Sequence, residues 1–170
     1  DAVLIGPGLG RKAETSEFVR LFAADVKVPL VMDADAIAAF QGHLDALRDL
    51  PQVPILTPHL GEFAALLGKT VDEVEDDLLG VAREAAHAHQ AVFVVKSACT
   101  IVVYPDGDAF FTTCGNAGMA TAGAGDVLAG TIAGLMRQME SGMTPIVGVY
   151  AHGRAGDLAY EYNGNGLVAG

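Results

Sequence analysis

The sequence feature that most directly indicates chemistry is a glycine-rich segment that runs into an apolar helix. Residues 116–126 read Asn-Ala-Gly-Met-Ala-Thr-Ala-Gly-Ala-Gly-Asp, and mostly apolar, helix-forming residues continue to position 135. Glycines let the backbone approach a ligand closely, and the first turn of a helix presents unpaired N–H groups and a positive dipole end to an anion. The segment therefore predicts a phosphate-binding loop.

Asp126 stands at the mouth of this predicted loop, where a carboxylate would repel a phosphate. Such a placement is typical of a base that accepts a proton from a hydroxyl group while the hydroxyl oxygen attacks phosphorus. The amides of Ala124 and Gly125 would then stabilise the charge on the transferring group. The alternative is a glycine-rich turn in which Asp126 is an ordinary N-cap.

Short apolar strands alternate with helices along the chain. We expect strands at 2–5, 29–32, 53–56 and 92–95, helices at 14–24, 34–40, 61–67, 71–89, 126–139 and 145–160, and a hairpin with arms at 100–104 and 109–113. The long helix begins with a Thr70–Glu73 capping box. This alternation predicts an α/β fold with a mainly parallel sheet that is covered on both faces.

Glycine and polar residues come directly after the predicted parallel strands. They are the loop 6–10, Asp33 with Asp35, His59 with Glu62, and Lys96. Because ligands of such folds bind at the carboxyl ends of the strands, we expect these residues to share one rim. Lys96 is either a phosphate contact there or a surface lysine.

Composition limits the possible function classes. The chain has 170 residues, of which 51% are hydrophobic and 18% charged, so we expect one globular domain over residues 1–170. The net charge of −11 argues against nucleic acid as a partner, and no apolar run is long enough to span a membrane. Because the chain begins in mid-fold without methionine, we expect a domain that is incomplete at its N-terminus and lacks a few C-terminal residues.

Two cysteines cannot form a disulfide framework, and they favour a cytoplasmic protein with reduced thiols. A two-residue hairpin loop at Asp106 and Gly107 would set Cys99 opposite Cys114. A three-residue loop would shift that register by one residue.

Six sequence blocks together resemble one family, the ADP/ATP-dependent NAD(P)H-hydrate dehydratases. The blocks are 6–10 (Gly-Pro-Gly-Leu-Gly), 33–36 (Asp-Ala-Asp-Ala), 56–63 (Leu-Thr-Pro-His-Leu-Gly-Glu-Phe), 96–100 (Lys-Ser-Ala-Cys-Thr), 104–107 (Tyr-Pro-Asp-Gly) and 115–130. The resemblance implies a ribokinase-like three-layer αβα sandwich with a β-hairpin near the nucleotide site. It also implies removal of water from C6-hydrated NADH or NADPH at the expense of a nucleotide phosphate.

The same resemblance implies roles for individual residues. Nucleotide contacts are implied for Lys96, Ser97, Ala98, Cys99, Thr100, Asn116, Met119, Ala120, Thr121, Gly123, Ala124 and Gly125, and substrate contacts for Gly8, Gly10, His59 and Asp126. Glu62 is implied to order Mg²⁺ through water, and its alternative is a solvated carboxylate in the first turn of a helix. ADP or ATP would be the phosphate donor of a cytoplasmic homotetramer.

The chain departs from the family pattern at Ser97, where a glycine is usual, so we expect a slightly reshaped nucleotide loop. Two other functions stay open. One is a kinase of the same fold that phosphorylates a small alcohol such as a vitamin precursor, and the other is a non-catalytic nucleotide-binding module. The second gains nothing from a carboxylate beside a phosphate.

Overall fold

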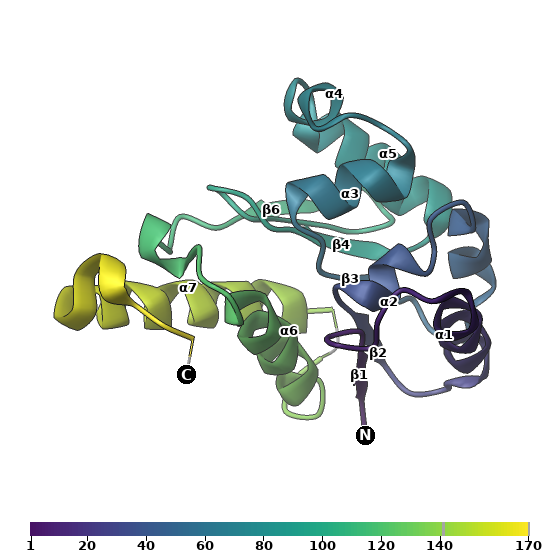
Figure 1. Cartoon of the computed structure of the whole chain (residues 1–170), viewed down its shortest axis with the longest axis horizontal. Helices are drawn as coiled ribbons and strands as arrows, with labels where there is room; N and C mark the ends of the chain where they lie inside the picture. The colour runs from purple at the N-terminus through teal and green to yellow at the C-terminus, as the bar shows by residue number, and fades with distance from the viewer. Residues whose placement is uncertain (141, 170) are drawn as a thin grey trace.

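A six-stranded sheet forms the centre of the computed structural model, which describes residues 1–140 and 142–169 (Figure 1). The strands are β1 (Val3–Ile5), β2 (Leu30–Met32), β3 (Ile55–Leu56), β4 (Val92–Val95), β5 (Ile101–Val103) and β6 (Ala109–Phe111). They lie side by side in sequence order. The first four are parallel, and β5 and β6 add an antiparallel hairpin. The predicted mainly parallel sheet is confirmed.

Helices cover both faces of this sheet. They are α1 (Ala13–Asp25), α2 (Asp35–Ala38), α3 (Leu60–Leu67), α4 (Val71–Glu75), α5 (Leu78–His89), α6 (Ala124–Leu135) and α7 (Thr144–Asn163), with short 3-10 turns η1 (Leu44–Asp49), η2 (Ala117–Met119) and η3 (Gly164–Gly166). Figure 1 shows α6 and α7 on one side of the sheet and α1 to α5 on the other. In the part of the chain that is described, no helix is both long and apolar enough to cross a membrane.

Strand β4 shows why the sheet is buried on both faces. Phe93 and Val95 pack in the core beneath α1 to α5, whereas Val92 and Val94 pack in a second core with Ile132 of α6. Successive side chains of a strand point to opposite faces, so an all-apolar strand requires a helical layer on each side. Helix α6 follows the hairpin in sequence but returns to contact β1 and β2.

The expected helix over 71–89 is wrong, because the structure divides it into α4 and α5. The Thr70–Glu73 capping box is present at the start of α4. Asp77 then leaves the helical conformation, with φ −145° and ψ 60°, and its carboxylate accepts a hydrogen bond from Gly80 N at 3.0 Å. An aspartate side chain that caps a new helix competes with continuation of the old one.

The hairpin has a three-residue loop. Tyr104 N donates to Asp108 O at 2.9 Å, and Gly107 N donates to Tyr104 O at 3.0 Å. Ile101 therefore pairs with Phe111, and this register does not set Cys99 opposite Cys114. Both cysteines are free thiols.

Candidate functional site

The carboxyl ends of the four parallel strands form one rim, as the sequence predicts. Backbone hydrogen bonds extend past the strand ends, from Asp33 N to Ile5 O at 3.1 Å and from Thr57 N to Met32 O at 3.1 Å. Lys96 N likewise donates to Pro58 O at 2.7 Å. These bonds continue the parallel ladder by one residue, which places the side chains that follow the strands next to one another.

Asp33 and Lys96 form a partly buried ion pair on this rim. Asp33 is 1% exposed, and its Oδ1 accepts hydrogen bonds from Thr57 Oγ1 at 2.7 Å and from Lys96 Nζ at 2.9 Å. The sequence placed Asp33 on the rim but assigned it no partner. Lys96 is therefore not an unpaired surface lysine: its ammonium group is hydrogen-bonded to a buried carboxylate and lines the same rim. Its contact with phosphate stays a prediction.

This ion pair lies against the first turn of α6. A Cβ atom built on Gly125 would come within 3.1 Å of Lys96 Nζ and 3.8 Å of Asp33 Oδ2. The absence of a side chain at Gly125 lets Lys96 approach the helix closely. The ammonium group stands beside the helix end that the sequence predicts to bind phosphate.

Asp126 is the third residue of α6, and the N-cap is Gly123, which has φ +87° and makes no side-chain cap. The N-cap alternative for Asp126 is therefore wrong. Its carboxylate lines a cavity and has no hydrogen bond or ion pair to any residue that the structure describes. The side chain is thus available to a ligand.

The backbone amides at the start of α6 differ in part from the expected pair, Ala124 and Gly125. Ala124 N donates to Thr121 O at 3.2 Å, so that amide already has an acceptor. Gly125 N and Asp126 N have no backbone acceptor within 1–140 and 142–169. The free donors are therefore those of Gly125 and Asp126 rather than those of Ala124 and Gly125.

A cavity of about 960 Å³ joins the rim to α6 and α7. Of the predicted site residues, it is lined by His59, Glu62, Lys96, Ser97, Ala98, Thr100, Asn116, Met119, Ala120, Thr121, Ala124, Gly125 and Asp126. Cys99, Gly123, Gly8 and Gly10 do not line it. The sequence expectation missed the walls that α7 and the hairpin contribute, namely Thr112, Cys114, Val149, His152 and Gly153.

His152 is the missed residue with the clearest chemical character. It is half-buried in α7 and lines the cavity. Burial lowers the pKa of His152, the nearby charge of Lys96 lowers it further, and a backbone hydrogen bond with Ala124 acts in the opposite direction. The imidazole is therefore neutral at pH 7. The sequence treated it only as a helix residue near the core.

The glycine loop after β1 does not line the cavity and is instead hydrogen-bonded to Asp35. Asp35 Oδ2 accepts from Gly10 N at 2.8 Å, and Oδ1 accepts from Arg11 Nε at 2.8 Å. The Arg11 hydrogen bond, followed by that of Gly10, lowers the pKa of Asp35. Gly8 and Gly10 have φ values of +74° and +83°, a conformation that favours glycine.

His59 and Glu62 close the N-terminus of α3. Glu62 N donates to His59 Nδ1 at 3.2 Å, and His59 N donates to Glu62 Oε2 at 3.0 Å. This reciprocal pair is a capping box. Glu62 lies in the first turn of α3, as its alternative expects, but its side chain is only 14% exposed, so it is not a simply solvated carboxylate. Both residues still line the cavity. Within the described ranges, no three or more histidine, cysteine, aspartate or glutamate residues cluster as a metal site.

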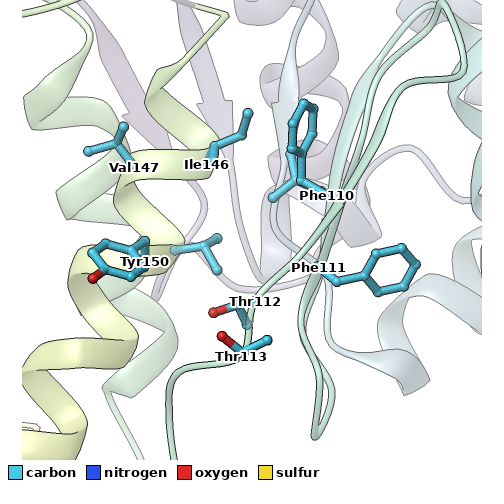
Figure 2. Close-up of a pocket in the computed structure, with 9 residues that line it drawn as sticks. Phe110, Phe111, Thr112, Thr113, Ile146, Val147 and Tyr150 are labelled. Atoms are coloured by element: carbon cyan, nitrogen blue, oxygen red, sulfur yellow. The ribbon is translucent and has the colours of Figure 1, made fainter.

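A smaller apolar pocket of about 230 Å³ lies between α7 and the hairpin (Figure 2). Figure 2 shows Phe110 and Ile146 on its two sides. Thr112 and Val149 line both this pocket and the main cavity, so the two hollows adjoin. Its lining is apolar or hydroxyl-bearing, which distinguishes it from the charged rim.

Comparisons with known proteins agree on one family. A family model described as NAD(P)H-hydrate dehydratase matches residues 1–169. The bifunctional NAD(P)H-hydrate repair enzyme Nnr of Moorella thermoacetica is 42% identical over 172 residues, which cover 100% of this chain and 32% of that enzyme. The ADP-dependent (S)-NAD(P)H-hydrate dehydratase of Neisseria meningitidis is 36% identical over 177 residues, which cover 100% of this chain and 60% of that enzyme.

Solved structures show the same similarity. An ADP/ATP-dependent NAD(P)H-hydrate dehydratase from Bacillus subtilis, co-crystallised with ATP/Mg²⁺ and soaked with CoA, matches with a TM-score of 0.87 and 32% identity, covering 99% of this chain and 61% of that chain. A ribokinase-like superfamily protein from Enterococcus faecalis matches with a TM-score of 0.79 and 31% identity over 95% of this chain and 56% of that chain. The ribokinase-like fold predicted from sequence is thereby confirmed. The chain spans 32% to 60% of the length of the two enzymes named above.

Proposed function

This chain belongs to the NAD(P)H-hydrate dehydratase family, and from that membership we propose that it carries the site for nucleotide-dependent dehydration of C6-hydrated NADH or NADPH. The observation that carries the proposal is the placement of Asp126. Its carboxylate has no partner in the described structure and lies in the first turn of α6, beside the free amides of Gly125 and Asp126. This arrangement suits transfer of a phosphoryl group to an alcohol.

The proposed reaction replaces a poor leaving group with a good one. Asp126 accepts the proton of the C6 hydroxyl group while the hydroxyl oxygen attacks the terminal phosphorus of ADP or ATP, and the phosphoanhydride bond to the remaining nucleotide breaks. The C6–O bond then breaks, and the ring-nitrogen lone pair drives departure of phosphate. Loss of a proton from C5 restores the double bond of the dihydronicotinamide.

The free amides and Lys96 would stabilise the transferring phosphoryl group. The amides of Gly125 and Asp126 lie in the first turn of α6 and have no backbone acceptor in the described part of the chain. The Lys96 ammonium group is held next to this turn by its hydrogen bond to Asp33. Donors that are fixed before the reaction need little reorganisation as negative charge develops. We infer that the Asp33 carboxylate positions the Lys96 ammonium group next to Gly125.

The described residues could hold Mg²⁺ only together with water molecules and the phosphates of a bound nucleotide. Mg²⁺ keeps several waters and is usually held by one or two carboxylates together with substrate phosphates. Glu62 lines the cavity, although one of its oxygens already caps α3, so we propose that it would hold the ion through water. A bound Mg²⁺ would neutralise phosphate charge. The homotetramer and the cytoplasmic location remain proposals that rest on the family resemblance.

The decisive experiment uses the full-length protein with hydrated NADH and either ADP or ATP. We expect the absorbance of the dihydronicotinamide to return with at least one of the two nucleotides. No recovery with either nucleotide would overturn the proposed function. Accumulation of a phosphorylated product without dehydration would instead favour the alternative of a small-alcohol kinase.

Removing the ammonium group of Lys96 should reduce turnover. For Lys96→Met we expect a fall in kcat of about a hundredfold, because one preformed donor to the phosphoryl group is lost. The variant also leaves buried Asp33 without its cation, which we expect to lower the free energy of unfolding by about 2 kcal/mol. Steady-state kinetics and thermal unfolding measure the two effects.

The double variant Asp33→Asn/Lys96→Met separates these effects. It removes the orphaned charge, so most of the lost stability should return while turnover stays low. If turnover returned together with stability, Lys96 would serve the fold alone.

A further inference from the structure

Asp157 of α7 makes a set of contacts that the proposed reaction does not use. Its two carboxylate oxygens accept hydrogen bonds from Gly115 N, each at 3.2 Å, and Oδ1 also accepts from Asn116 Nδ2 at 3.0 Å. Arg154 Nη1 lies 3.4 Å from Oδ2. The hydrogen bonds from Asn116 and Gly115 are the main causes that lower the pKa of Asp157, so the carboxylate is charged at neutral pH.

These contacts shape the loop that precedes α6. Asn116 Oδ1 accepts from Gly118 N at 3.1 Å and caps η2, so Asp157 and Gly118 are linked through one asparagine side chain. Asp157 lies 41 residues from Asn116 in the sequence. Gly115, Asn116 and Ala117 all line the main cavity. Asp157 itself does not line the cavity, but its carboxylate fixes the backbone of residues that do.

Helix α7 also provides the space that this loop requires. A Cβ atom on Gly153 would lie 2.9 Å from Cys114 O, and a Cβ atom on Gly156 would lie 2.2 Å from Met119 Sδ. Positions 153, 156 and 157 share one face of a helix because they are spaced by three and four residues. Two of them lack side chains where the loop approaches, and the third binds the loop backbone.

We propose that Asp157 is a positioning residue that holds residues 115–118 in the conformation that binds a nucleoside diphosphate or triphosphate. This inference rests on the proposed function. A loop that is ordered before binding loses little conformational freedom when the nucleotide enters. Asp157 therefore affects nucleotide affinity, and the phosphoryl transfer at Asp126 proceeds at its usual rate once the nucleotide is bound.

The test compares Asp157→Ala with the wild type in the full-length protein. For ADP and ATP we expect Kd and KM to rise about tenfold, because hydrogen bonds to a charged group are lost. The kcat at saturating nucleotide and the melting temperature should stay close to the wild-type values. Asp157→Asn keeps one acceptor oxygen, so it should recover part of the affinity.

Glu161→Ala is the matched control, since Glu161 is an exposed carboxylate on the same helix that makes no hydrogen bond or ion pair with the described residues of the loop. An unchanged KM in Asp157→Ala, an equal rise in Glu161→Ala, or a loss confined to kcat would overturn the inference. In the Asn116→Ala background, Asp157→Ala should cost much less affinity than in the wild type, because the two residues act through one hydrogen bond.

Hydrogen exchange separates this inference from the proposed function. In the nucleotide-free protein, the amides of Gly115 and Gly118 should exchange about tenfold faster in Asp157→Ala than in the wild type. Equal exchange rates would overturn the positioning role even if both nucleotides bind. A wild-type protein that binds neither nucleotide would overturn the proposed function, whatever the exchange rates show.

Discussion

Asp126→Asn should lower the rate of NADH-hydrate dehydration by about a thousandfold or more, because the amide cannot accept the proton of the substrate hydroxyl group. The change is nearly isosteric, and the Asp126 carboxylate makes no hydrogen bond or ion pair with any residue that the structure describes. The fold and the free amides of the helix end should therefore persist. Nucleotide affinity should stay within about threefold of the wild-type value, since those amides supply the phosphate contacts.

Two measurements test this prediction. The return of dihydronicotinamide absorbance reports turnover, and calorimetric titration with ADP or ATP reports binding. Asp76→Asn at the end of α4 is a suitable control, because it makes the same chemical change on an exposed surface. A wild-type rate in Asp126→Asn would refute the role of this carboxylate as the base.

The second large effect is expected for Gly6→Ala, which should lower the free energy of unfolding by about 3 to 5 kcal/mol. Gly6 follows β1 with φ +138°, and a Cβ atom there would lie 1.7 Å from the backbone oxygen of Asp33. This main-chain oxygen directly follows β2 and already accepts a hydrogen bond from Ala36 N at 3.1 Å, so it cannot move away freely. The rim would open between β1 and β2, and we expect the melting temperature to fall by about 10 °C.

Gly8→Ala provides the matched control two residues away. Its φ of +74° also disfavours a side chain, but nothing lies within 4 Å of a Cβ atom built there. It should therefore cost only about 1 kcal/mol of conformational strain. Equal melting temperatures for the two variants would show that strand β1 adapts to the added methyl group, and that the close approach of Gly6 to Asp33 does not hold the rim.

The fold was predictable because its signals are local. The all-apolar residues of β4 indicate a strand buried on both faces, and the structure places its alternate side chains in two separate cores. The division of 71–89 into two helices escaped prediction, because apolar periodicity continues across Asp77. The Asp77 carboxylate caps the start of α5, and this one hydrogen bond ends α4. Whether an aspartate caps a new helix or lies within a continuous one depends on the backbone conformation, which the apolar pattern does not reveal.

The candidate site was predictable to the extent that it follows strand ends and a helix start. Asp33, Lys96 and Asp126 each come directly after or within such an element, and the structure brings them to one rim. The hairpin register was left open between two loop lengths. The register depends on whether two or three residues form the turn. The residue types around Pro105 and Gly107 are compatible with both lengths, so the sequence does not decide between them.

The sequence by itself determined the strand and helix order, the glycine-rich helix start and the position of the carboxylate at Asp126, because each depends on residues adjacent in the chain. Only the tertiary structure decided which charged groups meet: Lys96 with Asp33, 63 residues apart, and Asn116 with Asp157, 41 residues apart. Periodicity determines which face of an element is buried, but it does not determine which polar side chains face each other across two elements. That pairing depends on how the elements pack in three dimensions.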